Sequence, residues 1–292
     1  MTSLYDGGGS KRSLFLPIVI SFLALTIAGG GVWAYLSVSS DHVTLDAQTL
    51  CPVSGPLSRT VMLLDVTDPL DDRQAAALAT LLSDLRNPAT SEAAMSAAKL
   101  RGGVRYVEPY GEIVAYSIRQ SGTAMEPFLR VCNPGNPEKM SLEDEFTASK
   151  RRVSARWNKF EERILSAFSS ASSSDEQTDS PLLETLALIV QREASSVALR
   201  ASGRDTPLRL IIFSDMIQHS KALSHFRRYP GAPDFLRSGE LAALRSDLSS
   251  IEVVVYYLRR SQYAQFQSLQ HFQWWQDVMA GMNGDLIYLE PI

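Results

Sequence analysis

Several features that define common functional classes are missing from this chain. Its 28 lysines and arginines are outnumbered by 32 acidic residues, giving a formal net charge of -4. It therefore lacks the basic surplus of a nucleic-acid-binding protein, and we expect no nucleic-acid partner. No run of like charges indicates an interaction tail. P-loop, dinucleotide-binding and nucleophile-elbow motifs are absent from any strand-to-helix context, and no internal repeat is visible.

Histidine is also scarce, with four residues in the chain. His219 and His225 are six positions apart, which is not a recognised zinc-binding spacing. We therefore expect them to be surface or loop residues near a site rather than metal ligands. The paired arginines Arg259 and Arg260 follow a predicted strand, and we expect both to be solvated.

One long hydrophobic run covers residues 14–36 (LFLPIVISFLALTIAGGGVWAYL) and contains no charged residue. About 20 apolar residues suffice to cross a bilayer as a helix. Lys11 and Arg12 precede the run and Asp41 follows it, so the positive-inside rule places the N-terminus in the cytoplasm. We predict a single-pass anchor in the cytoplasmic membrane of a bacterium. The alternative is a cleaved signal peptide, although the run is long for one and no A-x-A site follows.

The predicted organisation has four parts. Residues 1–13 form a cytoplasmic N-terminus, 14–36 a transmembrane helix, 37–57 a polar linker or stalk, and 58–292 one α/β domain in the periplasm. The only two cysteines, Cys51 and Cys132, lie beyond the anchor and beside turn-forming residues. In an oxidising compartment such a pair forms a disulfide, which we predict here. Two buried free thiols are the alternative, because sequence spacing does not fix the geometry.

Hydrophobic periodicity predicts alternating strands and helices in the soluble part. The strands are 60–66, 208–213, 252–258 and 285–289, and the helices are 71–86, 141–168, 181–194, about 238–248 and 263–282. Two further β-rich runs within residues 103–118 predict an antiparallel hairpin. Apolar strands between helices indicate a doubly wound, mostly parallel sheet covered on both faces. Because adjacent helical residues face different ways, we expect either Trp274 or Trp275 to contact a partner or the membrane.

Two predicted strands end in aspartate. Asp65 closes the run TVMLLDV, and Asp215 follows LRLIIF and Ser214. The carboxyl ends of parallel strands share one edge of a sheet, where ligands bind. This element order and these two positions resemble a von Willebrand factor A (vWA) domain over about residues 58–292. The family's metal-ion-dependent adhesion site has a D-x-S-x-S pattern. Here Asp65 matches the first position, Thr67 keeps the second hydroxyl, and Pro69 cannot supply the third.

The resemblance implies a metal held by Asp65, Thr67, Asp215 and a loop threonine. Thr178 is the best-placed candidate for the last ligand, with Ser180 as the second choice. Carboxylate and hydroxyl oxygens suit Mg²⁺, and Mn²⁺ is considered with it. The alternative is a degenerate, metal-free site, in which Asp68 caps the following helix and Pro69 starts it.

The function that follows is a membrane-anchored, non-enzymatic protein-binding module within a membrane-associated assembly. Its partner would bind the loops that carry Asp65, Thr67, Asp215 and the contact residue Asp68, with an acidic partner residue completing any metal coordination. One alternative is a metal-assisted phosphohydrolase using Asp65 and Asp215. Thr67 stands where the D-x-D pattern of haloacid dehalogenases has its second aspartate, which counts against that alternative. Another is a purely structural subunit with a relic metal site.

Overall fold

The computed structural model describes residues 43–87, 106–118, 126–137, 150–172, 178–194 and 208–292, together with residue 26. Thr44–Ile292 forms one compact unit. The predicted span 14–36 lies outside the described residues, apart from Thr26. Within the described ranges, none of the helices combines the length and the apolar character that crossing a membrane requires.

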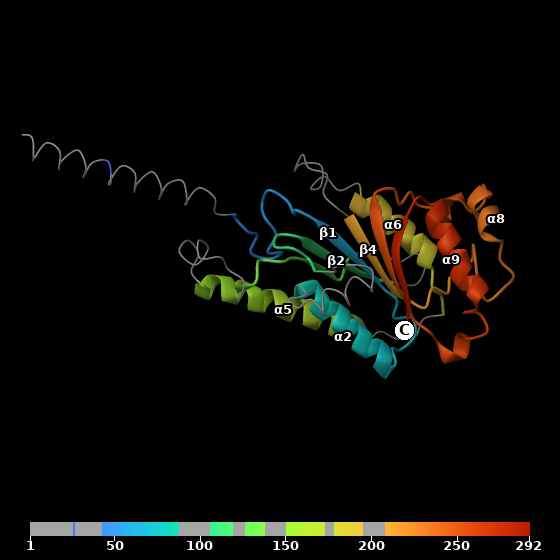
Figure 1. The fold of residues 1–292 in the computed structure, drawn as a ribbon, viewed down its shortest axis with the longest axis horizontal. Helices are drawn as coiled ribbons and strands as arrows, with labels where there is room; N and C mark the ends of the chain where they lie inside the picture. Colours follow the sequence, from blue (N-terminus) through green and yellow to red (C-terminus); the bar gives the residue numbers. More distant parts are fainter. Residues whose placement is uncertain are drawn as a thin grey trace, which may run out of the picture. The chain divides into compact units, whose positions relative to one another are not determined.

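A six-stranded mixed sheet forms the centre of this unit (Figure 1). The strands are β1 (Arg59–Leu64), β2 (Glu112–Ser117), β3 (Leu129–Cys132), β4 (Leu208–Ser214), β5 (Ile251–Tyr257) and β6 (Asp285–Pro291). Their order is β3-β2-β1-β4-β5-β6, and β3 at the edge is antiparallel to β2 while the other pairs are parallel. This confirms a mostly parallel α/β sheet with one antiparallel edge pair.

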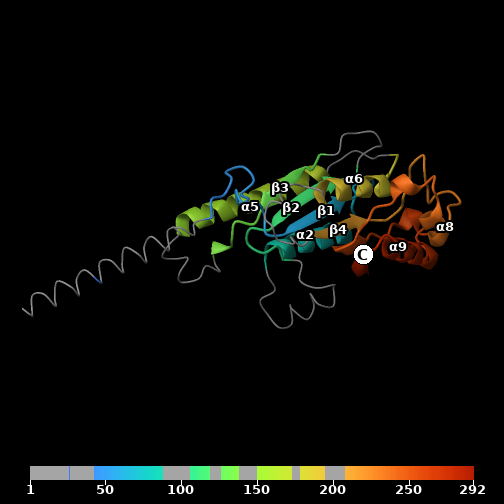
Figure 2. The same cartoon turned by 90° about the horizontal axis from the view of Figure 1, so that it is seen from above.

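Helices cover both faces of the sheet (Figures 1 and 2). They are α2 (Asp72–Arg86) and α5 (Lys150–Ser172) on one face, and α6 (Leu182–Ala194), α8 (Ala232–Arg237) and α9 (Leu269–Gly281) on the other. Strand β1 shows why two layers are needed. Met62 and Leu64 pack with α2 and α5, whereas Val61 and Leu63 pack with α6 and α9. Successive strand residues face opposite sides, so a continuously apolar strand must be covered twice.

The predicted hairpin had the wrong strands. The antiparallel partner of β2 is β3, not the run that precedes β2. Val107 of that earlier run is buried, and its N–H donates to Leu85 O at the end of α2. A turn then leads into β2, with Gly111 N donating to Glu108 O and Tyr110 held at φ 68°. Local β propensity was therefore overridden by packing against a helix.

Three further predictions need correction. The helix expected at about 238–248 is replaced by α8, which ends at Arg237, and a single 3-10 turn at Ala242–Leu244. The cap of α2 is Asp71 in a capping box with Gln74, not Asp68. Trp274 and Trp275 are both buried. Trp275 faces the sheet. Trp274 packs against Phe235 of α8, so α8 covers the ring of Trp274.

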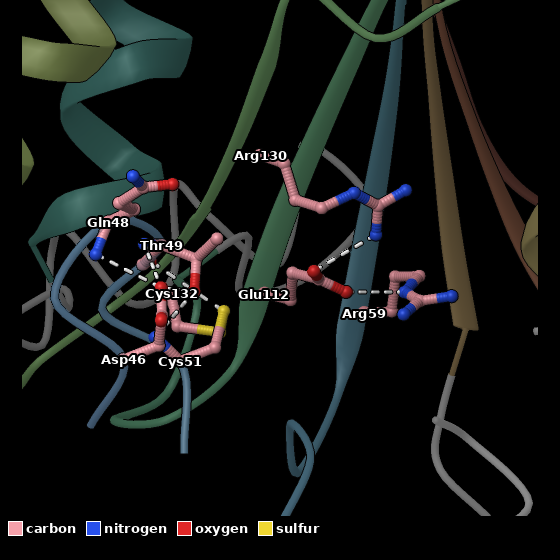
Figure 3. Close-up of a disulfide and its surroundings, with 8 residues drawn as sticks. All are labelled: Asp46, Gln48, Thr49, Cys51, Arg59, Glu112, Arg130 and Cys132. Carbon is pink, nitrogen blue, oxygen red and sulfur yellow. Dashed lines mark hydrogen bonds and ion pairs between the residues drawn. A yellow bond between two sulfur atoms is a disulfide. The ribbon is translucent and has the colours of Figure 1, made fainter. Parts of the chain in front are cut away.

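The segment before β1 is held on the domain. Of the connector predicted over 37–57, the structure describes residues 43–57. Asp46 Oδ1 organises a turn there by accepting from Gln48 N and Thr49 N at 3.0 and 2.6 Å. Cys51 is joined to Cys132 of β3 with an S–S distance of 2.06 Å, which confirms the predicted disulfide (Figure 3).

We predict that replacing both cysteines, Cys51→Ser with Cys132→Ser, lowers the free energy of unfolding by about 2–4 kcal/mol. The disulfide spans 81 positions, and removing it releases a long loop in the unfolded chain. Urea unfolding followed by tryptophan fluorescence measures the loss. Reductant should lower the stability of the wild type to a similar extent and leave the double variant unchanged. Equal stability of wild type and variant would contradict the prediction.

Candidate functional site

Three strand ends meet at one edge of the sheet. Asp65 directly follows β1, Asp215 directly follows β4, and Arg260 lies three residues beyond β5. The strands are in parallel register, and Asp65 N donates to Phe213 O at 2.9 Å. We call this group the crest and define it by the following residues: Asp65, Thr67, Asp68, Ser214, Asp215 and Arg260. Sequence reasoning found all of them except Arg260 and the contribution of the Ser214 hydroxyl.

Asp65 is buried, with 2% of its surface exposed, and its carboxylate is bonded on both oxygens. Its Oδ1 accepts from Thr67 N at 3.2 Å and from Thr67 Oγ1 at 2.7 Å. Its Oδ2 accepts from Ser214 Oγ at 2.6 Å. A carboxylate with several protein donors is held in one orientation. The Thr67 hydroxyl, which the vWA resemblance assigns to a metal, is thus directed at the carboxylate itself, as is the hydroxyl of Ser214.

Asp215 is equally buried, and the backbone after it is bent. Its Oδ1 accepts from Ile217 N at 2.8 Å, while Met216 adopts a left-handed conformation with φ 61°. Such a conformation costs a non-glycine residue about 1–2 kcal/mol, and the Trp275 indole donating to Met216 O at 2.7 Å holds it in place. Burial raises the pKa of Asp215 well above its ordinary value of 3.8, and the charge of Asp65 raises it further.

Arg260 was expected to be solvated, and this was wrong. It is 7% exposed, and its guanidinium reaches back to the loop that follows β1. It donates to the carbonyl oxygens of Pro69 and Asp68 and to Gln74 Oε1. Its Nε lies 4.0 Å from Asp215 Oδ2. Its charge lowers the pKa of Asp215 and so opposes part of the effect of burial.

The predicted metal ligands are only partly gathered. Asp65, Thr67 and Asp215 belong to the crest. Thr178 is exposed, whereas Ser180 is buried and exchanges backbone hydrogen bonds with His219 at 2.9 and 2.8 Å. Mg²⁺ requires oxygen lone pairs that are free to coordinate it. A donor set whose lone pairs accept from protein groups, beside a resident guanidinium, is a poor fit to that requirement.

In the part of the chain that the structure describes, the group of acidic, cysteine and histidine side chains close enough to share an ion is Cys51, Glu112 and Cys132. Both of its cysteines are in the disulfide. A disulfide-bonded sulfur has no thiolate to offer a metal. This group is therefore not a metal centre.

Two buried histidines lie behind the crest. His225 was expected near the surface but is 3% exposed, and its Nδ1 lies 2.8 Å from His271 Nε2. Tyr257 Oη lies 2.7 Å from His271 Nδ1. Burial lowers the pKa of His225 to about 2, assisted by His271, and burial lowers that of His271 to about 4. The sequence spacing does indicate that His271 is buried, because His271 and Trp275 are one helical turn apart on the buried face of α9.

A second buried polar cluster lies at the opposite end of the strands (Figure 3). Arg59 begins β1 and donates to Glu112 at the start of β2, at 2.6 Å. Arg59 also pairs with Glu193 at 2.9 Å, and Arg130 pairs with Glu112 and Glu193 at 3.0 and 2.7 Å. The two arginines and two glutamates balance in charge. Tyr116 donates to Glu193, and burial with this neighbour raises the pKa of Tyr116.

Comparisons with known proteins found a similarity in structure but none in sequence. No protein-family model matches the chain. No curated protein sequence matches it either. Among solved structures, the chain is similar to the crystal structure of the SpRpn10 VWA domain, with 12% sequence identity and a TM-score of 0.36. That match covers 81% of this chain and 88% of the other. A resemblance to a vWA domain therefore has to be argued from the sheet order and the strand ends described above.

We predict that the free energy of unfolding falls as the pH drops below about 6.5. The unfolded chain binds protons at His225 and His271 near pH 6.5, whereas the folded chain resists protonation until about pH 2 and 4. Each histidine then costs about 2 kcal/mol at pH 5 relative to pH 8. Asp215 acts in the opposite sense, because its raised pKa favours the folded state at low pH.

Urea midpoints at pH 8 and pH 5 measure this loss. The variant His271→Gln should lose less stability between the two pH values than the wild type, and His219→Gln serves as the matched control. Wild type and His271→Gln responding identically to pH would refute this account.

Proposed function

We propose that this protein is a membrane-tethered, vWA-like protein-binding module on the outer side of a bacterial cytoplasmic membrane. The observation that carries the proposal is the meeting of Asp65, Asp215 and Arg260 at the carboxyl edge of three neighbouring strands. Buried charged groups cost stability compared with an apolar core of the same volume. Their placement at the edge where α/β sheets bind ligands favours a binding surface.

The rim of the crest supports contact with a protein. Asp68 is half-buried, while Pro69, Asp71 and Asp72 beside it are exposed. The loop that carries them is fixed from below, because its carbonyl oxygens accept from Arg260 and Asp71 caps α2. A preformed loop loses little conformational entropy when a partner binds. In this proposal Asp68 is the residue that touches the partner.

The geometry does not favour the phosphohydrolase alternative. A nucleophilic aspartate needs an oxygen that can reach a substrate. Asp65 is 2% exposed and accepts from Thr67 and Ser214. We therefore propose that the protein is not an enzyme. The remaining alternative, a structural subunit with a relic site, differs in one respect: substitutions at the rim would leave partner capture intact.

We predict that the full-length protein stays in the membrane fraction after alkaline extraction, and that removal of residues 14–36 releases it. The uncharged run would hold the chain as an uncleaved anchor. A C-terminal reporter that is active only outside the cytoplasm should be active in the full chain. Mass spectrometry of the N-terminus is the control for processing. Cleavage near residue 37, or extraction at alkaline pH, would contradict the anchor.

We predict that Asp68→Lys lowers capture of the partner about tenfold or more, equivalent to about 1.4 kcal/mol. A lysine at the rim would repel a partner surface whose charge complements the acidic loop. The measurement is photo-crosslinking in living cells from a probe at Pro69. Asp234→Lys is the matched control, since Asp234 is an exposed aspartate of α8. Equal crosslinking for Asp68→Lys and wild type would favour the structural-subunit alternative.

A further inference from the structure

The crest places two carboxylates close together in the interior. Asp65 and Asp215 are 2% and 4% exposed and follow neighbouring parallel strands, and the hydroxyl of Ser214, the residue before Asp215, donates to Asp65 Oδ2 at 2.6 Å. Two neighbouring buried anions repel each other, and a buried charge is tolerated only when it is paired or hydrogen-bonded. A positive charge at this edge of the sheet would offset that repulsion.

Arg260 supplies a positive charge from inside the chain. Its guanidinium is fixed by three acceptors: the carbonyls of Pro69 and Asp68 on the loop after β1, and Gln74 Oε1 in the first turn of α2 at 3.0 Å. Its Nε, which has no hydrogen-bond partner among the described residues, lies 4.0 Å from Asp215 Oδ2. Arginine keeps its charge at every physiological pH, and its fork can satisfy several acceptors at once.

Two glutamines hold this arrangement in register. Gln74 accepts from Arg260 Nη1 and donates through Nε2 to Arg259 O at 2.9 Å. Gln267 accepts from Arg260 N at 2.7 Å and donates to Asp215 O at 3.0 Å. The arginine is thus tied both to the loop after β1 and to the turn after β4. These hydrogen bonds fix the position of Arg260 far more closely than the position of a solvated arginine would be fixed.

The position of Pro69 connects the arginine to the incomplete motif. Where the vWA resemblance expects the third motif hydroxyl, this chain has a proline, which has no hydroxyl to offer a metal. The carbonyl of the same residue accepts from Arg260. The two departures from a metal site, a missing ligand and a resident cation, therefore meet at one residue.

We propose that Arg260 takes the place of a divalent cation at the crest, so that Asp215 is compensated by the arginine, and Asp65 by its hydrogen bonds, without Mg²⁺ or Mn²⁺. This inference concerns the folded protein itself and stands apart from the identity of any partner. It also deepens the proposed function: if the crest captures a partner, it does so in the presence of a chelator.

The first test is a thermal melt of the full-length protein with Mg²⁺, with Mn²⁺ and with chelator, followed by tryptophan fluorescence. The wild type should melt at the same temperature in all three. A metal that binds the folded protein, present at 100 times its Kd, would raise Tm by on the order of 5–10 °C. A saturable rise that disappears in Asp65→Asn would overturn the inference, while leaving a cation-dependent form of the proposed function in place.

The second test asks whether Arg260 compensates Asp215. Arg260→Gln should lower Tm by on the order of 10 °C, because it leaves buried charge unpaired. Arg259→Gln is the matched control, since Arg259 is adjacent, of the same type and exposed. In an Asp215→Asn background, where that charge is gone, Arg260→Gln should lower Tm by roughly half as much.

Equal falls for Arg260→Gln and Arg259→Gln, or an unchanged fall in the Asp215→Asn background, would overturn the compensating role. Where Arg260→Gln does not fold, Arg260→Lys, which keeps the charge but not the fork, replaces it in the same cycle. Crosslinking of the partner in chelator separates the two proposals. Complete absence of crosslinking in every condition would count against the proposed function alone, because the melts judge the cation.

Discussion

The constraint on which this molecule depends is the burial of two carboxylates at the ends of adjacent central strands. Parallel register brings Asp65 and Asp215 to one edge, and burial makes each of them costly. Three groups offset that cost: the hydroxyls of Ser214 and Thr67, which donate to Asp65, and the guanidinium of Arg260, which lies beside Asp215. The left-handed Met216 and the loop before α2 take the shapes that this arrangement requires.

Sequence alone predicted the parts of the fold that depend on local pattern. Residues 61–64 of β1 and 210–213 of β4 are all apolar, and the rule for parallel strands then placed Asp65 and Asp215 together. It failed where partners distant in sequence decide the outcome. Arg260 looked solvated at a strand end, yet its acceptor Pro69 is 191 positions away. His225 gave no periodic signal, because it sits in a loop whose burial comes from α9.

The two ends of the parallel strands solve the same electrostatic problem differently. At the crest, Asp215 lies beside one buried arginine and Asp65 accepts hydrogen bonds from Thr67 and Ser214. At the other end, Arg59 and Arg130 meet Glu112 and Glu193 in a balanced network. Balanced buried pairs contribute little net stability but disfavour mispaired strands. The end that relies on hydrogen bonds and one arginine, rather than on balanced ion pairs, is the end we assign to binding.

The disulfide also decides how mechanical load would travel through the domain. Cys51 lies before β1, whereas Cys132 ends β3 at the far edge of the sheet. A pull on the chain upstream of Cys51 is therefore transmitted covalently to the edge strand, and β1 and β2 lie within the closed loop between the two cysteines. If the domain is tethered as proposed, tension between the tether and the chain beyond Cys132 would bypass the closed loop that contains β1 and Asp65. Without the disulfide, the same tension would pass from the linker directly into β1.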